Sequence, residues 1–229
     1  MVDLQQLYKS YNNKGVLINL NLSVKEGQVL GITGKNGSGK TTLLKIICGF
    51  EKADAGEVRI LNEISRKYSI GVSLSESDQL INELDGFTFL GFIGRIYKKS
   101  AFEIDKRILE LSEYFEFSDV LYKPIDSYST GTKKKISICT SIFHNPSLLL
   151  LDEPFENLDT NSCHKLIALL RTYTSPDKII IITSNQIDHL LELTNNIGIL
   201  SNGRITDFEV DPELKTIDVK NRILAELDK

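Results

Sequence analysis

The chain has 229 residues, a net charge of -4 and a pI near 5.5, a balance that gives no electrostatic reason to expect nucleic acid binding. No apolar stretch approaches the roughly 18 residues of a membrane-spanning helix, and residues 1–11 lack the charged and apolar regions of a signal peptide. The three cysteines lie far apart in apolar-periodic segments, which predicts buried free thiols in a reducing cytoplasm: Cys48, Cys139 and Cys163.

The first third of the chain is expected to consist mainly of strands. Within residues 2–33, apolar and polar residues alternate at Leu20, Leu22 and Val24, which is typical of a half-buried strand. Residues 25–28 then form a turn. Three short apolar strands are expected at residues 29–33, 56–61 and 69–74.

The middle of the chain is expected to be helical. Scattered apolar and aromatic residues over 77–100 favour a helix, and Ser100-Ala101-Phe102-Glu103 is a capping box that opens another. Pro124 breaks this pattern, and a third helix is expected from Ser129 to about His144. Strands then alternate with helices again, at 148–153 (strand), 160–173 (helix), 178–183 (strand), 187–193 (helix), 197–200 (strand) and 204–209 (strand). This alternation predicts a mostly parallel sheet, interrupted by a helical insertion over about 77–135.

The stretch from Gly34 to Thr42, GKNGSGKTT, has the spacing of a phosphate-binding loop. Its glycines allow successive backbone N–H groups to converge on phosphate oxygens. Lys40 places a positive charge against the outer phosphates, and the Thr41 hydroxyl can join the coordination shell of Mg²⁺. An apolar strand precedes the loop and a helical pattern follows it, so the sequence predicts a nucleoside triphosphate site.

A second polar feature ends the buried strand Leu148–Leu151, where Asp152 and Glu153 follow directly. Carboxylates placed there would otherwise be poorly solvated. In a phosphate-loop protein the first acid commonly supports Mg²⁺, and the second could polarise an attacking water. The alternative is generic capping of the strand end.

The order of phosphate loop, helical insert, Tyr128-Ser129-Thr130-Gly131-Thr132 and LLLLDEP resembles the ATP-binding cassette (ABC) ATPases, to about residue 208. Within that family it looks most like the nucleotide-binding subunits of exporters and drug- or peptide-resistance transporters. The resemblance implies an α/β fold, a P-loop NTPase (RecA-like) core with a mostly parallel sheet, an N-terminal antiparallel β subdomain and an inserted α-helical subdomain. The expected parts of this single domain are a core (1–76 and 136–210), a helical signature subdomain (77–135) and a tail (211–229).

The resemblance also implies roles for individual residues. Glu153 would be the general base and Asn185 would stand at the switch position; Thr41 and Asp152 would hold Mg²⁺. Asp159 would face the opposite subunit. The nucleotide would be bound by Tyr11, which stacks on adenine, and by Gly34, Lys35, Asn36, Gly37, Ser38, Gly39, Lys40, Thr41 and Thr42. The signature that meets the ATP of the opposite subunit would be Ser129, Thr130, Gly131 and Thr132. Taken alone, Lys133–Lys135 would be a solvated basic face.

Three departures from the family pattern concern the rate of hydrolysis. The usual signature Leu-Ser-Gly-Gly-Gln becomes Tyr-Ser-Thr-Gly-Thr, with Thr130 and Thr132 as the changed positions. Asn185 stands where a His is usual; it can donate a hydrogen bond but cannot titrate. The family's Gln near the strand of residues 69–74 has no clear counterpart, with Ser75 or Glu76 at its place and Gln79 a few residues later.

The leading hypothesis is therefore an ATPase subunit with ATP and Mg²⁺ as its cofactors. Its partners would be a second ABC ATPase subunit, in a homodimer or heterodimer, and a transmembrane permease, but no nucleic acid. It would be cytoplasmic, held on the inner face of the cell membrane through that permease. The alternative is a soluble regulatory or assembly ATPase with weak hydrolysis and no transport role. The tail from residue 211 carries a helical pattern that could be regulatory or merely a cap.

Overall fold

The protein contains two β-sheets, as its computed structural model shows for residues 1–60, 70–75, 80–194, 196–210 and 216–227. The smaller sheet is antiparallel, with the strand order β2-β1-β4. Its strands are β1 (Val2–Tyr11), β2 (Lys14–Val24) and β4 (Ala55–Ile60). Leu20, Leu22 and Val24 are all buried, so the predicted alternation along β2 is confirmed.

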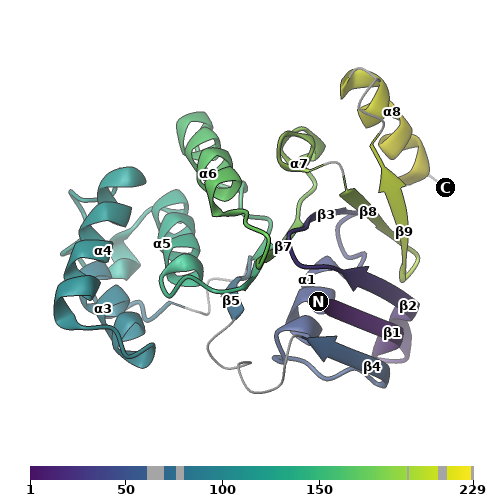
Figure 1. Ribbon diagram of the computed structural model, residues 1–229, viewed down its shortest axis with the longest axis horizontal. Coiled ribbons are helices and arrows are strands. Elements are labelled where there is room, and N and C mark those ends of the chain that lie inside the picture. Colours follow the sequence, from purple (N-terminus) through teal and green to yellow (C-terminus); the bar gives the residue numbers. More distant parts are fainter. Residues whose placement is uncertain (61–69, 76–79, 195, 211–215, 228–229) are drawn as a thin grey trace.

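The larger sheet has six strands in the order β5-β6-β7-β3-β8-β9, all parallel except β9 (Figure 1). The strands are β3 (Val29–Thr33), β5 (Ile70–Ser73), β6 (Leu148–Asp152), β7 (Ile179–Thr183), β8 (Asn196–Ser201) and β9 (Arg204–Glu209). Every residue of the central strands β6 and β7 is buried. Both faces are covered, which explains why these strands are continuous apolar runs.

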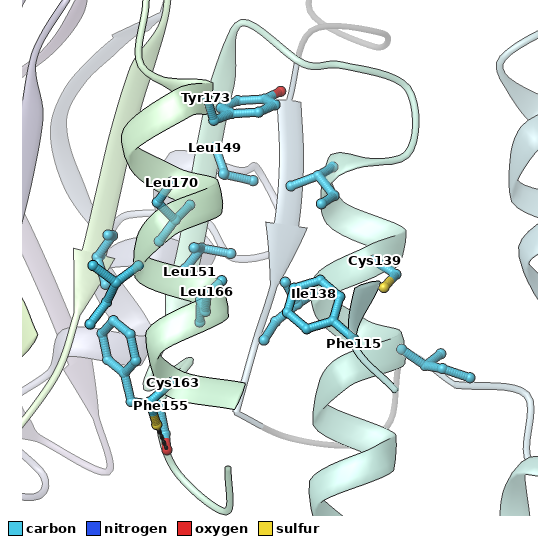
Figure 2. Close-up of a cluster of buried hydrophobic side chains, with 14 of the residues drawn as sticks. Phe115, Ile138, Cys139, Leu149, Leu151, Phe155, Cys163, Leu166, Leu170 and Tyr173 are labelled. Carbon is cyan, nitrogen blue, oxygen red and sulfur yellow. Dashed lines mark hydrogen bonds between the residues drawn. The ribbon is translucent and has the colours of Figure 1, made fainter. Parts of the chain in front are cut away.

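Each face of the large sheet belongs to a separate apolar core. Leu148 and Leu150 of β6 pack with α1 (Lys40–Ile47) and the small sheet. Leu149 and Leu151 point to the opposite face, where Figure 2 shows them between the side chains of α5 and α6. The helices over this second face are α5 (Thr130–Ile142), α6 (Thr160–Tyr173), α7 (Ile187–Leu193) and α8 (Thr216–Leu227). Among the described residues, no helix is long and apolar enough to cross a membrane.

The helical insertion lies at one end of the molecule (Figure 1). It consists of α3 (Gly86–Ile96), α4 (Ala101–Tyr114), the short 3₁₀ helix η3 (Ile125–Ser127) and α5. The capping box predicted for α4 is confirmed, since Ser100 accepts from the Glu103 amide and the Glu103 carboxylate accepts from the Ser100 amide. Within the insertion, the Tyr128 hydroxyl donates to the Val120 carbonyl at 2.8 Å, which connects the segment before α5 to the segment after α4.

One local expectation was wrong, and one was confirmed. The helix expected over 77–100 runs only from Gly86 to Ile96, because the Asp85 side chain accepts from the Thr88 amide at 2.8 Å and caps the helix start there. Residues 80–85 form turns and a bridge instead, and residues 76–79 lie outside the described chain. The turn expected at 25–28 is confirmed, since the Gln28 amide donates to the Lys25 carbonyl at 3.2 Å; it joins β2 to β3, which belong to different sheets.

The cysteines and the tail largely follow the sequence. All three thiols are free; Cys139 and Cys163 are buried and Cys48 is half-buried. Burial raises the pKa of each thiol, which disfavours the reactive thiolate form. The helical pattern of the tail is confirmed as α8, which buries Val219 and Ile223 in the core shared with α7 and β8.

Candidate functional site

The loop between β3 and α1 has a backbone that only glycine permits. Gly37 and Gly39 have φ values of 78° and 106°, in the left-handed region. A β-carbon on Gly34 would lie 2.5 Å from the Leu200 carbonyl oxygen and 2.6 Å from Ser38 Oγ. Gly39 is also the N-cap of α1, and no side chain caps that helix start. The first N–H groups of α1 are therefore directed at the loop, where an anion would be stabilised.

Lys40 is the buried cation of this loop, with only 6% of its surface exposed. Its Nζ donates to the Gly34 carbonyl at 2.7 Å and to Asn185 Oδ1 at 2.9 Å. It also lies 3.4 Å from Glu153 Oε1, an ion pair whose members are both largely buried. The ammonium thus joins the loop to residues that follow β6 and β7.

Asp152 is fully buried at the end of β6, and its carboxylate accepts hydrogen bonds from three hydroxyl groups. Thr41 Oγ1 and Ser75 Oγ donate to Oδ2 at 2.7 and 2.5 Å, and Thr183 Oγ1 donates to Oδ1 at 2.5 Å. The donors come from α1, from the residues after β5 and from the end of β7. All the groups assembled here are hard oxygen ligands, the kind that Mg²⁺ prefers.

Glu153 directly follows Asp152, and its backbone leaves the strand abruptly. Its φ of 44° lies in the left-handed region, which is uncommon outside glycine. Its amide donates to the Thr183 carbonyl at 3.0 Å, and its Oε2 accepts from the Asn185 amide at 3.0 Å. This sharp turn directs the carboxylate toward Lys40 and the loop.

Asn185 connects the two ends of the loop. Its Oδ1 accepts from Lys40 Nζ, and its Nδ2 donates to Asn36 Oδ1 at 2.6 Å. The residue expected at the switch position therefore lies against the loop, with one acceptor and one donor both in use.

A cavity of about 380 Å³ opens beside these groups. Tyr11, expected to stack on adenine, lines it from the end of β1 and is 42% exposed. Lys9 Nζ lies 5.0 Å from the centre of the Tyr11 ring. The other lining residues are Val16, Asn36, Gly37, Gly39, Lys40, Thr41, Thr42, Ser75, Glu153 and Glu156. One cavity thus brings together the loop, the aromatic ring and Glu153.

Comparison with known proteins decides the family. The family model described as "ABC transporter" matches residues 17–156, more than half of the chain. The chain belongs to the ABC transporter family. It is 26% identical to the linearmycin resistance ATP-binding protein of Bacillus subtilis, over 90% of this chain and 68% of that protein. It is 30% identical to a sulfate/thiosulfate import ATP-binding protein of Shewanella oneidensis, over 93% of this chain and 59% of that protein.

Solved structures agree with this assignment of the cassette. A dimeric ATP-binding cassette in a post-hydrolysis state, bound to ADP and Pi, is 26% identical with a TM-score of 0.82 and covers 92% of this chain and 99% of that one. The ATP-binding subunit of an ABC transporter matches both chains completely with a TM-score of 0.83; at 23% identity it supports the fold alone. The resemblance to the ABC ATPases is therefore confirmed. The α/β P-loop fold and ATPase as the enzyme class of the cassette are confirmed too. The chain spans 68% and 59% of the two curated relatives above.

The residues expected to form the signature lie at the start of α5, and they do not line this cavity. Ser129 is the N-cap; its Oγ accepts from the Thr132 amide at 3.1 Å and lies 2.9 Å from Thr132 Oγ1. Ser129 and Thr130 are exposed, and Gly131 and Thr132 are half-buried. None of the four is among the described residues that line the cavity beside the loop.

Asp159, the residue expected to face another subunit, is the N-cap of α6. Its carboxylate accepts from the Ser162 amide at 2.8 Å and from Ser162 Oγ at 2.7 Å. These hydrogen bonds, with the charge of Lys135 at 3.7 Å, lower the pKa of Asp159. The residue is exposed, so its charge stands at the surface of the cassette.

The expectation that Lys133–Lys135 form a solvated basic face was wrong. Lys134 and Lys135 are only 7% and 9% exposed, so the triplet is not a solvated face. Burial lowers the pKa of Lys134, while the nearby carboxylates of Asp152, Glu156 and Glu153 oppose that shift. The triplet begins four residues after the N-cap Ser129, and two of its three side chains turn inward, Lys134 to the end of β6 and Lys135 to Asp159.

Two polar residues beside Asp152 and Glu153 had no role at the site in the sequence expectations: Thr183 and Lys134. Ser75 stood only as a candidate for the family's missing Gln; it donates to Asp152 from its own hydroxyl. Glu76 and Gln79, the other candidates, lie outside the described residues. Thr183 had a usable signal, since it is a polar residue that ends a buried apolar strand, as Asp152 does.

Proposed function

We propose that this chain is the ATP-binding and ATP-hydrolysing subunit of an ABC transporter, which powers a separate membrane permease. The observation that carries the proposal is the convergence of Lys40, Glu153 and Asn185 on one loop, beside a cavity that Tyr11 also lines. A cation for phosphate, a carboxylate for water and an aromatic face for a base are the parts that ATP hydrolysis requires.

Each side chain has a definite task in this reaction. Lys40, paired with Glu153 and Asn185, turns to the outer phosphates when ATP enters. Glu153 accepts the proton of the attacking water, and its position is set by the amide of Asn185. The Asn185 side-chain amide donates to a γ-phosphate oxygen, and the ring of Tyr11 stacks on adenine.

A magnesium ion fits the residues present. Thr41 and Asp152 would hold it, since their oxygens already adjoin at 2.7 Å, and it would neutralise charge on the β- and γ-phosphates. The described residues include no group of three or more His, Cys, Asp or Glu side chains suited to a metal. A site with one carboxylate and one hydroxyl suits Mg²⁺, which keeps several waters and takes the rest of its ligands from phosphate.

The proposed reaction needs a second subunit. Ser129, Thr130, Gly131 and Thr132 lie outside the cavity beside the loop, at a helix N-terminus that suits an anion. We infer that they meet the γ-phosphate of ATP bound to the opposite subunit, with Asp159 near the same contact. The similar cassette solved with ADP and Pi is dimeric, which supports this inference.

The partner of the dimer is proposed to be a transmembrane permease, which places the chain on the inner face of the membrane. The curated relatives are named for both resistance and import, so the proposal specifies the power source and leaves the solute to the permease. The proposed division of labour assigns 1–76 and 136–210 to nucleotide binding, 77–135 to the signature and the permease contact, and 211–229 to the tail.

The test is ATP turnover by the purified chain, alone and with the permease that co-purifies with it. Turnover that depends on Mg²⁺, stops with a chelator and rises with the permease is expected. Glu153→Gln should bind ATP, hydrolyse it only at a small residual rate and migrate as a dimer in gel filtration with ATP. A chain that neither binds nor hydrolyses ATP would contradict the proposal, as would a Glu153→Gln variant that stays monomeric with ATP.

A further inference from the structure

Lys134 is a buried cation in contact with the strand that carries the acidic residues of the site. It lies on the second turn of α5, with 7% of its surface exposed, and its Nζ donates to the Asp152 carbonyl oxygen at 3.3 Å. The carboxylates of Asp152, Glu156 and Glu153 all act electrostatically on this ammonium. A buried ammonium is costly unless it is hydrogen-bonded and near opposite charge, and both conditions hold here.

The carbonyl that accepts from Lys134 belongs to the peptide unit that joins Asp152 to Glu153. The N–H of the same unit donates to the Thr183 carbonyl at 3.0 Å and lies 3.2 Å from Thr183 Oγ1. Both polar groups of this peptide are therefore hydrogen-bonded, the carbonyl to Lys134 of α5 and the N–H to Thr183 of β7. Its orientation sets the left-handed φ of 44° at Glu153, and so the direction in which that carboxylate points.

The same end of α5 is fixed to the segment that follows Glu153. A β-carbon on Gly131 would lie 2.7 Å from the Asn157 carbonyl oxygen, so the helix and this segment approach closely. Lys135 Nζ lies 3.7 Å from Asp159 Oδ2. The helix that begins with the exposed Ser129 and Thr130 thus contacts the chain at 152, 157 and 159.

We propose that Lys134 is a positioning residue, which holds the Asp152–Glu153 peptide and thereby ties the orientation of Glu153 to the placement of α5. This inference rests on the proposed function, because it assigns the reason why Glu153 faces the nucleotide. It connects two places in one chain: the signature at the start of α5, and the general base at the end of β6. A shift of the signature on binding an opposite nucleotide moves Lys134, and with it the peptide that aims Glu153.

A purely structural lysine and a positioning lysine give different results when the charge is removed. Removing one member of a buried group of charges leaves the others uncompensated and destabilises the fold. Lys134→Met should therefore lower Tm whichever role the lysine has, so the rates are compared at a temperature where each variant is folded. There the loss of a purely structural lysine leaves kcat unchanged, whereas the loss of a positioning lysine should lower kcat by about ten- to a hundredfold, because misplacement of a reacting group by about 1 Å has effects of that size. KM should change by less than about twofold, because the phosphate loop is untouched.

The closing experiment measures ATP turnover, KM, ATP binding and Tm for the native chain, Lys134→Met and Lys134→Arg, with Lys133→Met as the matched control one position away. Lys134→Arg keeps the charge and the donors, so it should retain more of the rate than Lys134→Met, and Lys133→Met should behave as the native chain. A kcat of Lys134→Met within twofold of the native value would overturn the proposal. Equal rates for Lys134→Met and Lys134→Arg, measured at a temperature where both variants are folded, would overturn it too.

A double variant separates this inference from the function beneath it. If Lys134 acts through Glu153, Lys134→Met should slow the native chain but have little further effect in a Glu153→Gln background. Equal fold-losses in both backgrounds would show that Lys134 acts elsewhere and overturn the inference, while the ATPase function stands. A native chain that binds and hydrolyses no ATP would instead overturn the proposed function, and this inference with it.

Discussion

Thr183 Oγ1 donates a hydrogen bond to Asp152 Oδ1 at 2.5 Å, across the ends of the two central strands. The residues are register partners in the parallel pair β6–β7, so the contact follows from the strand alignment itself. The same hydroxyl oxygen lies 3.2 Å from the Glu153 amide. A single side chain therefore contacts both acidic residues of the site.

Removing this hydroxyl should destabilise the protein without changing its packing. Thr183→Val keeps the β-branched shape but leaves a fully buried carboxylate with one donor fewer. The expected loss is about 1–3 kcal/mol in the free energy of unfolding, measured by urea denaturation. Thr172→Val is the matched control, because the exposed Thr172 hydroxyl only donates to the Leu169 carbonyl of its own helix. Equal losses for the two variants would contradict the role given to Thr183.

The switch position gives a prediction about rate. Asn185 donates to Asn36 and accepts from Lys40, and it cannot take up a proton. A neutral imidazole also offers one donor and one acceptor, and it can become charged beside a γ-phosphate. Asn185→His should therefore raise ATP turnover, measured as phosphate release at saturating ATP. An unchanged or lower rate would show that Asn185 does not limit hydrolysis.

The acidic residues of this site could be predicted from the sequence because their environment there is unusual. Asp152 and Glu153 directly follow four leucines of a buried strand, where carboxylates are seldom needed for the structure alone. The fixed spacing of the phosphate loop then indicates which chemistry they serve. The hydrogen-bond partner of Ser75 and Thr183 could not be predicted in the same way. A polar residue at the end of a buried strand marks Thr183 as a candidate, but only the sheet order β5-β6-β7 places both hydroxyl groups on Asp152.

Local sequence patterns also gave wrong predictions where tertiary packing decides which residues are buried. The triplet Lys133–Lys135 looks solvated in the sequence, yet α5 packs against β5 and β6 on the face that carries Lys134 and Lys135. The helix expected over 77–100 was too long, since apolar composition does not mark a start and the Asp85 cap does. Charge runs and apolar runs indicate composition, while burial depends on which face meets a neighbour.

The close contact between β5 and α5 can be tested with two glycines. A β-carbon on Gly71 would collide with the carbonyl oxygen of Ser141, which belongs to a helix and cannot move aside cheaply. Gly71→Ala should therefore cost about 1–3 kcal/mol of stability. Among the described residues, a β-carbon on Gly91 of α3 would have no heavy atom within 4 Å apart from its own stretch of helix, so Gly91→Ala should stabilise by about 0.5–1 kcal/mol. Urea denaturation of both variants gives opposite signs if the contact is as described.

His144, which follows α5, should make stability depend on pH. Its ring stacks on Tyr97 at 3.6 Å, and burial lowers the pKa of His144 from 6.5 to about 4. Between these values the unfolded chain binds the proton and the folded chain does not, so stability present above pH 6.5 falls as the pH drops toward 4. His144→Phe keeps a ring against Tyr97 but binds no proton. Its free energy of unfolding should therefore fall less than that of the native chain between about pH 7 and about pH 4.5. Parallel pH profiles for the two proteins would mean that His144 takes up its proton equally in the folded and unfolded states, and would contradict the role given to this half-buried ring.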